Sequence, residues 1–372
     1  GIAYAHGKCW KTMRRFSLTT LRNFLMGKRI IEDTIVTECQ HLIQCFESHK
    51  GVLLKASIAN VIVSVLLGKW FDYQDSQFLR LLTLIGENMK LIGNPSIVLL
   101  NMFPILGFLL RSKKKVLRNR VELFSFIRMA FLEHCHNRNK SDPRSLIDAF
   151  LVRQQGGNSE NNTSANHFNE ENLLALVSNL FTARTKTTAS TLHWGIILMM
   201  LYPEVQKKVR GEIIKVVGSA QPRIEHRIQM PYTDTVIHEI EANILPTSLF
   251  HETTTDVAFK NYYIPKGTEI ITLLTSVLQD QTQWEASDAF DPAHFLSPKG
   301  TFVKKESFVP FSCHMCAGEP LAKMELFLFF TSLMQKFIFQ SPLVSHLDLD
   351  LTPDIGFIMQ SQPHKICALV RA

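Results

Sequence analysis

The chain has 372 residues, of which 46% are hydrophobic and 20% charged, and its formal net charge is +7. This composition excludes a disordered chain and is typical of a globular protein with an apolar surface or a membrane neighbour. Zinc-finger spacing, RNA-binding signatures and long arginine-rich runs do not occur in the sequence, so no nucleic-acid partner is expected despite the positive charge. The 7 cysteines are odd in number and scattered, which indicates a reduced, cytosol-facing chain rather than a disulfide framework.

Helical patterns dominate the first half of the chain. Apolar residues spaced three and four apart predict helices over residues 10–24, 29–46, 53–68, 77–91, 113–137 and 142–154. Asn169 is a predicted N-cap because Glu170 and Glu171 follow it at the positive end of the helix dipole. The helix that it opens is expected to run unbroken to about residue 201, and Pro203 is expected to open the next one.

The apolar run over residues 95–110 is too short to span a bilayer comfortably, and Pro104 interrupts it. Basic residues follow at 111–115, which suits a segment that lies against anionic lipid headgroups. A pair of core helices followed by a solvated basic turn is the alternative. The chain begins with Gly1, and neither a signal peptide nor a spanning segment is expected at its start.

After Pro246 the sequence changes to short strand patterns. Strands are expected over residues 257–259, 262–264 and 269–274, with a turn at 265–267, and a terminal strand over 366–370. A mainly helical body with small sheets late in the chain is therefore the expected architecture.

A cysteine precedes a long apolar helix in residues 308–330, which read FVPFSCHMCAGEPLAKMELFLFF. A thiolate at the start of this helix is stabilised by free backbone N–H groups and by the helix dipole, which suits the sulfur to hold a metal. Cys316 is the candidate ligand. Cys313 and Cys316 also form a Cys-x-x-Cys pair, so a zinc or redox site is an alternative, although the sequence has no second pair with zinc spacing.

This segment resembles the cysteine loop of the cytochrome P-450 family, especially its vertebrate microsomal family 2 members from fish. Residues 10–15, WKTMRR, resemble a helix whose Trp and Arg bind a haem propionate, and Trp10 and Arg14 lie four apart on one face. Residues 183–188, ARTKTT, are similar to the oxygen-activation motif, in which Ala183 and Thr187 share a face.

Later positions extend the resemblance. Glu239 is similar to the glutamate of the family's Glu-x-x-Arg motif, and His294 matches the third member of that structural network. His251 matches a propionate-binding histidine. The implied roles are iron ligation by Cys316, propionate binding by Trp10, Arg14 and His251, and oxygen activation by Thr187 beside Ala183.

The resemblance implies a mainly α fold with small β-sheets, the cytochrome P-450 fold, as a single domain over residues 1–372. That domain would lack the family's N-terminal anchor and its first strands and helices. Strands over residues 262–274 are then expected to be unpaired and to expose a sheet edge.

The implied activity is haem-thiolate monooxygenation: one oxygen atom of O2 enters a lipophilic small molecule such as a xenobiotic, fatty acid or steroid. The implied cofactor is haem b, the implied place is the cytosolic face of the endoplasmic reticulum membrane, and electrons would come from NADPH through a flavoprotein reductase. A basic docking face for that reductase is expected from Lys8, Lys11, Arg15, Arg22, Lys28, Arg29 and Lys323.

The chain departs from the family pattern at several positions. Arg184 and Lys186 stand in place of a glycine and an acid, and Ala242 stands in place of the Glu-x-x-Arg arginine. The cysteine loop is two residues short and lacks its glycine and arginine. A buried Glu239 without an arginine is expected to use His294 as a partial substitute, to reach water or to stay protonated. These departures favour an alternative hypothesis, a relative that keeps the fold without turnover.

Overall fold

The computed structural model describes residues 1–3, 5–25, 29–48, 54–94, 111–137, 145–156, 165–244, 249–287, 289–312, 316–342, 349–354, 359–362 and 364–370. Its α-helices are α1 (Gly7–Leu25), α2 (Arg29–Glu47), α3 (Leu54–Leu67), α4 (Ser76–Ile92), α6 (Arg111–Asn137), α7 (Leu146–Gly156), α8 (Glu170–Leu201), α9 (Pro203–Val216), α10 (Pro231–Ile244), α11 (Leu274–Leu278) and α12 (Glu319–Lys336). The strands are β1 (Leu249–Glu252), β2 (Val257–Phe259), β3 (Tyr262–Ile264), β4 (Glu269–Thr272), β5 (Phe337–Gln340), β6 (Pro353–Asp354), β7 (Gln360–Ser361) and β8 (Cys367–Val370).

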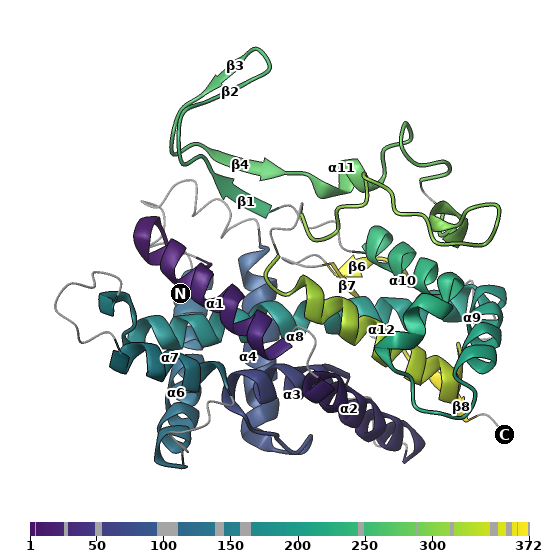
Figure 1. Ribbon diagram of the computed structural model, residues 1–372, viewed down its shortest axis with the longest axis horizontal. Helices are drawn as coiled ribbons and strands as arrows, with labels where there is room; N and C mark the ends of the chain where they lie inside the picture. The colour runs from purple at the N-terminus through teal and green to yellow at the C-terminus, as the bar shows by residue number, and fades with distance from the viewer. Residues whose placement is uncertain are drawn as a thin grey trace.

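The long helix α8 crosses the middle of the molecule and packs against α3, α4, α6, α9, α10 and α12 (Figure 1). Apolar residues surround it on nearly all sides, which is the pattern of a helix buried in a core. The Asn169 side chain accepts a hydrogen bond from the Asn172 N–H at 2.9 Å, so the predicted N-cap is confirmed. Pro203 opens α9, also as predicted.

The predicted helices are confirmed with small shifts at their ends. The largest is at α7, which begins at Leu146 rather than at residue 142. Ser145 precedes this helix, and its Oγ accepts a hydrogen bond from the Asp148 N–H at 3.1 Å. The Asp148 carboxylate accepts one from the Ser145 N–H at 3.1 Å in return. This reciprocal cap fixes the start of the helix and is visible in the sequence only as a serine followed three residues later by an acid.

The strands form two-stranded antiparallel pairs: β1 with β4, β2 with β3, β5 with β8, and β6 with β7. The expectation that strands over residues 262–274 lack partners is therefore wrong. Short connections let the segment fold back on itself, so β3 pairs with β2 and β4 pairs with β1, a strand that the sequence pattern did not reveal. Tyr262 and Tyr263 nevertheless remain exposed on this arm.

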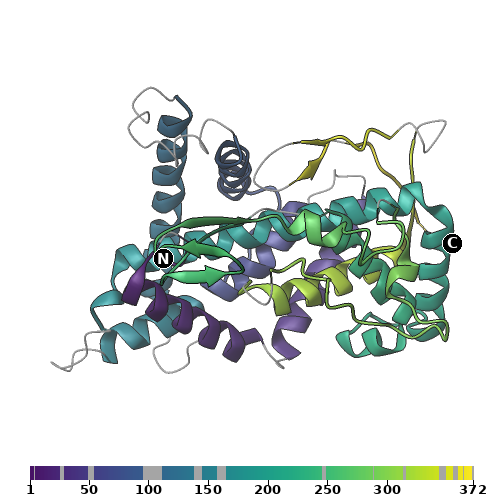
Figure 2. The same ribbon diagram turned by 90° about the horizontal axis from the view of Figure 1, so that it is seen from above.

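Seen from above, α1 and the start of α12 lie on one side of α8, and α4, α6 and the β6–β7 pair lie on the other (Figure 2). The apolar run over residues 95–110 lies outside the described residues. Within the described ones, no helix has both the length and the apolar character needed to cross a bilayer.

Candidate functional site

Cys316 lies at the turn that leads into α12. Gly318 is the N-cap of that helix, so the sulfur stands two residues before it rather than on its first turn, and the Cys316 side chain is exposed. The positive end of the α12 dipole therefore faces the turn that carries the thiol. Residues 313–315 lie outside the described residues, and with them the Cys313 half of the Cys-x-x-Cys alternative.

Ala183 and Thr187 form an open face in the middle of α8. Ala183 is exposed, although Phe181, Arg184 and Lys186 around it are buried. The Thr187 Oγ1 donates a hydrogen bond to the Ala183 carbonyl at 2.8 Å. The structure thus brings these two predicted residues together, with a side-chain hydroxyl on a helix face that no described side chain fully covers.

Arg184 ties this face to the cysteine turn. Its Nη1 donates to the Gly318 carbonyl at 3.2 Å, and its Nη2 lies 2.5 Å from Oε2 of Glu325 on α12. A Cβ placed on Gly318 would lie within 4 Å of both the Arg184 Nη1 and the Cys316 Sγ. The turn that holds the sulfur and the centre of α8 are therefore held close together by one buried guanidinium.

The start of the chain and strand β1 meet the same region. The Ile2 and Ala3 N–H groups each donate to Oδ1 of Asn179 at 3.1 Å, one helical turn before Ala183. His6 lies 3.9 Å from Glu252, the residue after His251 in β1. The segment before α1 therefore contacts α8 through Asn179 and lies close to β1 through Glu252.

Trp10 and Arg14 share one face of α1 as predicted, with the Arg14 guanidinium carbon 5.7 Å from the centre of the Trp10 ring. Both side chains are half-buried, as is His251 on β1. In the described part of the chain no hydrogen bond joins Trp10 or His251 to Cys316. Trp10 and Arg14 thus lie together on α1, and His251 lies on the separate strand β1.

Glu239 and His294 are brought together by the packing of α10 against residues 292–295. The His294 Nδ1 lies 3.2 Å from both carboxylate oxygens of Glu239, and its Nε2 contacts the Glu285 carbonyl. The Asn243 amide donates to Glu239 at 2.9 Å, one turn further along the helix. Burial raises the pKa of Glu239, and His294 partly opposes that shift. Asn243 and His294 together bind the Glu239 carboxylate, which an arginine binds in the family pattern. Ala242, which stands in place of that arginine, is buried.

Two of these partners were not predicted from the sequence. Glu325 is a lone acid inside the apolar run MELFLFF, and an acid at a buried helix position signals a hidden cation. Asn243 lies four residues after Glu239, a spacing that places both on one helix face. Both features are visible in the sequence, but only the fold shows that Glu325 pairs with Arg184 and that Asn243 binds Glu239.

The basic residues proposed for partner docking are mostly on the α1 surface. Lys8, Lys11, Arg15, Arg22 and Arg29 are exposed. Lys323 is half-buried, lies 2.7 Å from Glu319 and sits 5.5 Å from the centre of the Phe311 ring. Lys28 lies outside the described residues. The helix α1 and the start of α12, which carry all the described members except Arg29 of α2, lie on one side of the molecule (Figure 2).

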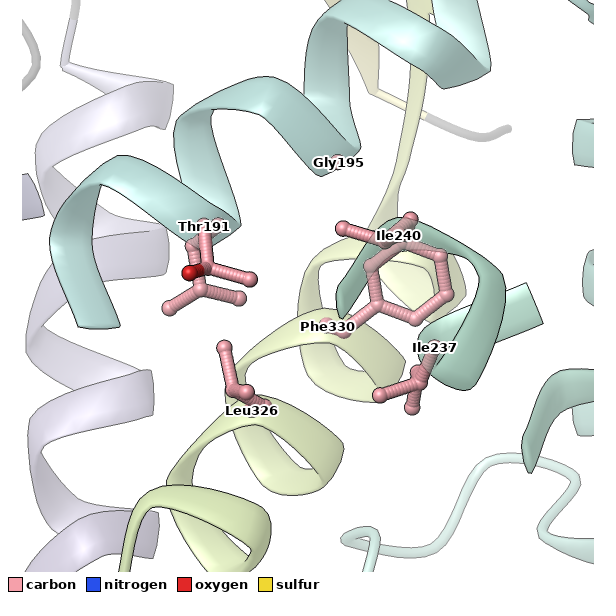
Figure 3. A pocket seen from close by; sticks show the side chains of 7 residues that line it. Thr191, Gly195, Ile237, Ile240, Leu326 and Phe330 are labelled. Atoms are coloured by element: carbon pink, nitrogen blue, oxygen red, sulfur yellow. The ribbon is translucent and has the colours of Figure 1, made fainter. Parts of the chain in front are cut away.

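A small apolar cavity lies further along α8, between α8, α10 and α12 (Figure 3). It is lined by Thr191, Leu192, Gly195, Ile237, Ile240, Leu326 and Phe330. A Cβ on Gly195 would lie 3.2 Å from the Ile240 side chain, so glycine permits the close approach of α8 and α10 here. None of the predicted site residues lines this cavity, which belongs to helix packing.

The residues around Ala183 fit an iron porphyrin. The open helix face supplies room on one side, and the exposed Cys316 sulfur supplies a soft ligand just before the N-terminal end of α12. Arg184, the bulky replacement in this motif, turns toward Glu325 and Gly318 instead of over Ala183. Indole and guanidinium donors on α1 suit the carboxylates of such a group.

Comparison with known proteins shows the family of the chain. The family model described as cytochrome P-450 matches residues 1–368. The chain is 42% identical to cytochrome P-450 2K6 of Danio rerio, an alignment that covers 100% of this chain and 76% of the relative. It is 44% identical to cytochrome P-450 2K1 of Oncorhynchus mykiss over the same shares, and 43% identical to cytochrome P-450 2C5 of Oryctolagus cuniculus, over 99% and 77%. The chain therefore belongs to the cytochrome P-450 family of haem-dependent monooxygenases, and haem b is the cofactor of that family.

Proposed function

We propose that this chain oxidises lipophilic small molecules as a haem-thiolate monooxygenase, in which Cys316 would hold the haem iron through its sulfur. The observation that carries the proposal is the tie from Arg184 to Gly318, because it holds the exposed face of Ala183 and Thr187 close to the Cys316 turn. When bound, haem b supplies the chemistry of O2 reduction and oxygen insertion. The chain's own residues hold the group, shield it and manage protons.

Cys316 provides a thiolate, which the positive end of α12 stabilises. Trp10 and Arg14 offer an indole N–H and a guanidinium from one face of α1 to a propionate. His251 offers a third donor from β1. These groups would donate hydrogen bonds to the carboxylates of the porphyrin and so fix its orientation.

Thr187 would handle a proton beside the bound group. Its hydroxyl donates to the Ala183 carbonyl, so its oxygen lone pairs can accept a hydrogen bond from the open side. Rotation about the Cβ–Oγ1 bond would turn the hydroxyl hydrogen toward that side and pass the proton on. Ala183 leaves space there because its side chain is a single methyl group.

Glu239, His294 and Asn243 act structurally in this proposal. Their hydrogen bonds hold α10 to the segment over residues 291–295, which lies before the cysteine turn in the chain. A satisfied buried carboxylate at this point keeps the two segments in one arrangement.

The same proposal includes electrons from NADPH through a flavoprotein reductase and a place at the endoplasmic reticulum membrane on its cytosolic face. The exposed basic residues of α1 support a reductase docking face, because charge complementarity speeds the encounter of two proteins. The names of the relatives do not identify a substrate, and the apolar surroundings of α8 support a lipophilic one.

The test is the absorbance of the full chain, produced with a haem supply, after reduction and exposure to CO. We expect a Soret band at the thiolate position, and we expect Cys316→Ser to lose it. Cys135→Ser, a matched change at an exposed cysteine on α6, should leave the band in place. A folded protein that takes up no haem, or a Cys316→Ser spectrum equal to that of the parent, would support the relative without turnover.

A further inference from the structure

A groove of about 700 Å³ lies between α2 and the end of α3, two helices that pack side by side (Figure 1). Its lining includes Ile30, Asp33, Glu38 and His41 of α2, Ser64 of α3, and Trp70, which follows α3. The volume is within the range of small-molecule sites in proteins. None of the residues predicted to hold haem lines this groove, so the proposed function does not use it.

Glu38 brings a buried carboxylate to the groove, with 1% of the residue exposed. The indole N–H of Trp70 donates to its Oε1, and the Tyr73 hydroxyl donates to its Oε2 at 2.6 Å. Asp33, in the same groove, is paired with Arg223. Glu38 pairs with no lysine or arginine in the part of the chain that the structure describes. Its carboxylate is therefore hydrogen-bonded, but its charge is not neutralised.

A buried carboxylate without a counter-ion is unfavourable, because burial removes the water that solvates the charge. Burial accordingly raises the pKa of Glu38 to about 7, although the hydrogen bonds from Tyr73 and Trp70 oppose the shift. A positive charge placed in the groove would favour the ionised carboxylate, since an opposite charge nearby lowers the pKa of a carboxyl group. The groove thus offers a complementary place for a cation.

Trp70 adds an aromatic ring to this charge. It is 50% exposed although its N–H is bound to Glu38, so part of the indole is open to a ligand. The rings of His41 and Tyr73 support it, with centroids 5.5 and 5.9 Å from its own. An aromatic ring beside an uncompensated carboxylate recognises organic ammonium ions, because the ring attracts the cation and contacts its alkyl groups.

The kind of cation follows from the same contacts. Both Glu38 oxygens already accept a hydrogen bond, so a ligand does not need N–H donors to be attracted to them. The described residues contain no group of three His, Cys, Asp or Glu side chains that could hold a metal ion. A quaternary ammonium ion needs only negative charge and apolar or aromatic surface around it.

We propose that the groove between α2 and α3 binds a small quaternary ammonium ion, which the Glu38 carboxylate and the Trp70 ring recognise. The exposed side chain of Ile30 extends the apolar surface for the alkyl groups of the ligand. The site is separate from the Cys316 turn and from the open face of α8, so the inference does not depend on the proposed function.

The experiment is isothermal titration calorimetry of the full chain, produced with a haem supply, at pH 8, where Glu38 is ionised. The probes share one shape: choline, the neutral 3,3-dimethylbutan-1-ol and the anionic 3,3-dimethylbutanoate. We expect choline to bind at least about tenfold more tightly than the alcohol, and the anion to bind most weakly. A quaternary nitrogen has no lone pair for iron, so bound haem does not account for this order.

Glu38→Gln keeps an oxygen acceptor but removes the charge, so it should lower the choline affinity to that of the alcohol and leave the alcohol affinity unchanged. Trp70→Leu keeps an apolar side chain without the ring and should weaken choline binding at least about threefold. The control is Glu204→Gln, which changes an exposed acid on α9 and should alter neither affinity. Circular dichroism checks that each variant is folded.

Equal binding of choline and the alcohol to the parent chain, or no choline binding, would overturn the site. A choline preference that survives in folded Glu38→Gln would do the same. If Glu38→Gln does not fold, the order of the three probes on the parent and the Trp70→Leu result decide. Cys316→Ser should keep the choline preference, so a failure of the haem proposal and a failure of this one give different results.

Discussion

Arg184 and Lys186 stand two residues apart on α8, and both bring a buried positive charge to the centre of the molecule. Arg184 meets the carboxylate of Glu325 and the Gly318 carbonyl on α12. Lys186, on the other flank, meets Lys55 and the neighbourhood of an already paired Asp354. One buried cation has a partner within the fold and the other has none among the described residues.

The difference teaches how to interpret a charged residue in an apolar helix. A paired charge fixes the approach of two helices, and removing either partner exposes the cost of burying the other. A buried charge without an acceptor weakens the fold, because burial removes the water that would solvate it. The two replacements in one motif are therefore expected to respond to mutation with opposite signs.

The largest expected effect on stability concerns the buried ion pair of Arg184 and Glu325. Arg184→Met should lower the free energy of unfolding by about 3–5 kcal/mol at pH 8, because it leaves the Glu325 carboxylate buried without a counter-ion. Burial raises the pKa of Glu325 to about 7, with Arg184 opposing the shift. The carboxyl group therefore takes up a proton below that pH, and the difference between variant and parent should shrink at pH 5. Urea unfolding at both pH values measures it.

The matched control replaces both partners with apolar residues. Arg184→Met combined with Glu325→Leu should unfold within about 1 kcal/mol of the parent, since neither charge remains to be buried. A double variant that is as unstable as Arg184→Met alone would mean that the pair stabilises the fold by its packing rather than by its charges.

Glu241 sharpens the comparison with a buried charge of the other sign. It is 1% exposed, and neither carboxylate oxygen has a hydrogen-bond partner among the described residues. Burial raises the pKa of Glu241 from 4.5 to about 7, and His238, Lys323 and Arg227 oppose the shift. Because the folded state holds this proton more tightly than the unfolded one, stability falls as the pH rises through that range.

Glu241→Gln removes this loss. The variant should be more stable than the parent by up to about 3 kcal/mol at pH 8, and the gain should vanish toward pH 4. Urea unfolding as a function of pH gives the measurement, with the exposed Glu204→Gln on α9 as the control. A gain that does not depend on pH would show that the glutamine stabilises the fold by its packing.

The smallest effect on stability is expected for Lys186, the buried cation that has no carboxylate partner of its own among the described residues. Lys186→Met should raise the free energy of unfolding of the ligand-free chain by about 1–2 kcal/mol at pH 7, allowing for solvent screening. Its folded-state pKa lies below the usual value, so this gain should disappear as the pH rises from about 8 toward 10.5. A loss of stability in Lys186→Met at pH 7, measured by urea unfolding, would place an unrecognised acceptor beside the ammonium group.

Much of the fold was predictable because its signals are local. The spacing of apolar residues located the helices, Asn169 and Pro203 marked two helix starts, and the strands β2 and β3 were predicted with their observed limits. Strand β1 was missed because its four residues carry no strong strand pattern. Its pairing with β4 arises from the folding back of residues 249–272.

The candidate site divides in the same way. The sequence by itself determined which residue types stand at which helical positions: a thiol before α12, Ala183 and Thr187 on one face of α8, and two cations between them. Helical geometry converts such spacing directly into shared faces. Only the tertiary structure decided that Arg184 finds Glu325, that Asn243 and His294 serve Glu239, and that Lys186 faces other lysines. The physical reason is that the energy of a buried charge depends on what the neighbouring elements bring to it, and those neighbours come from distant parts of the chain.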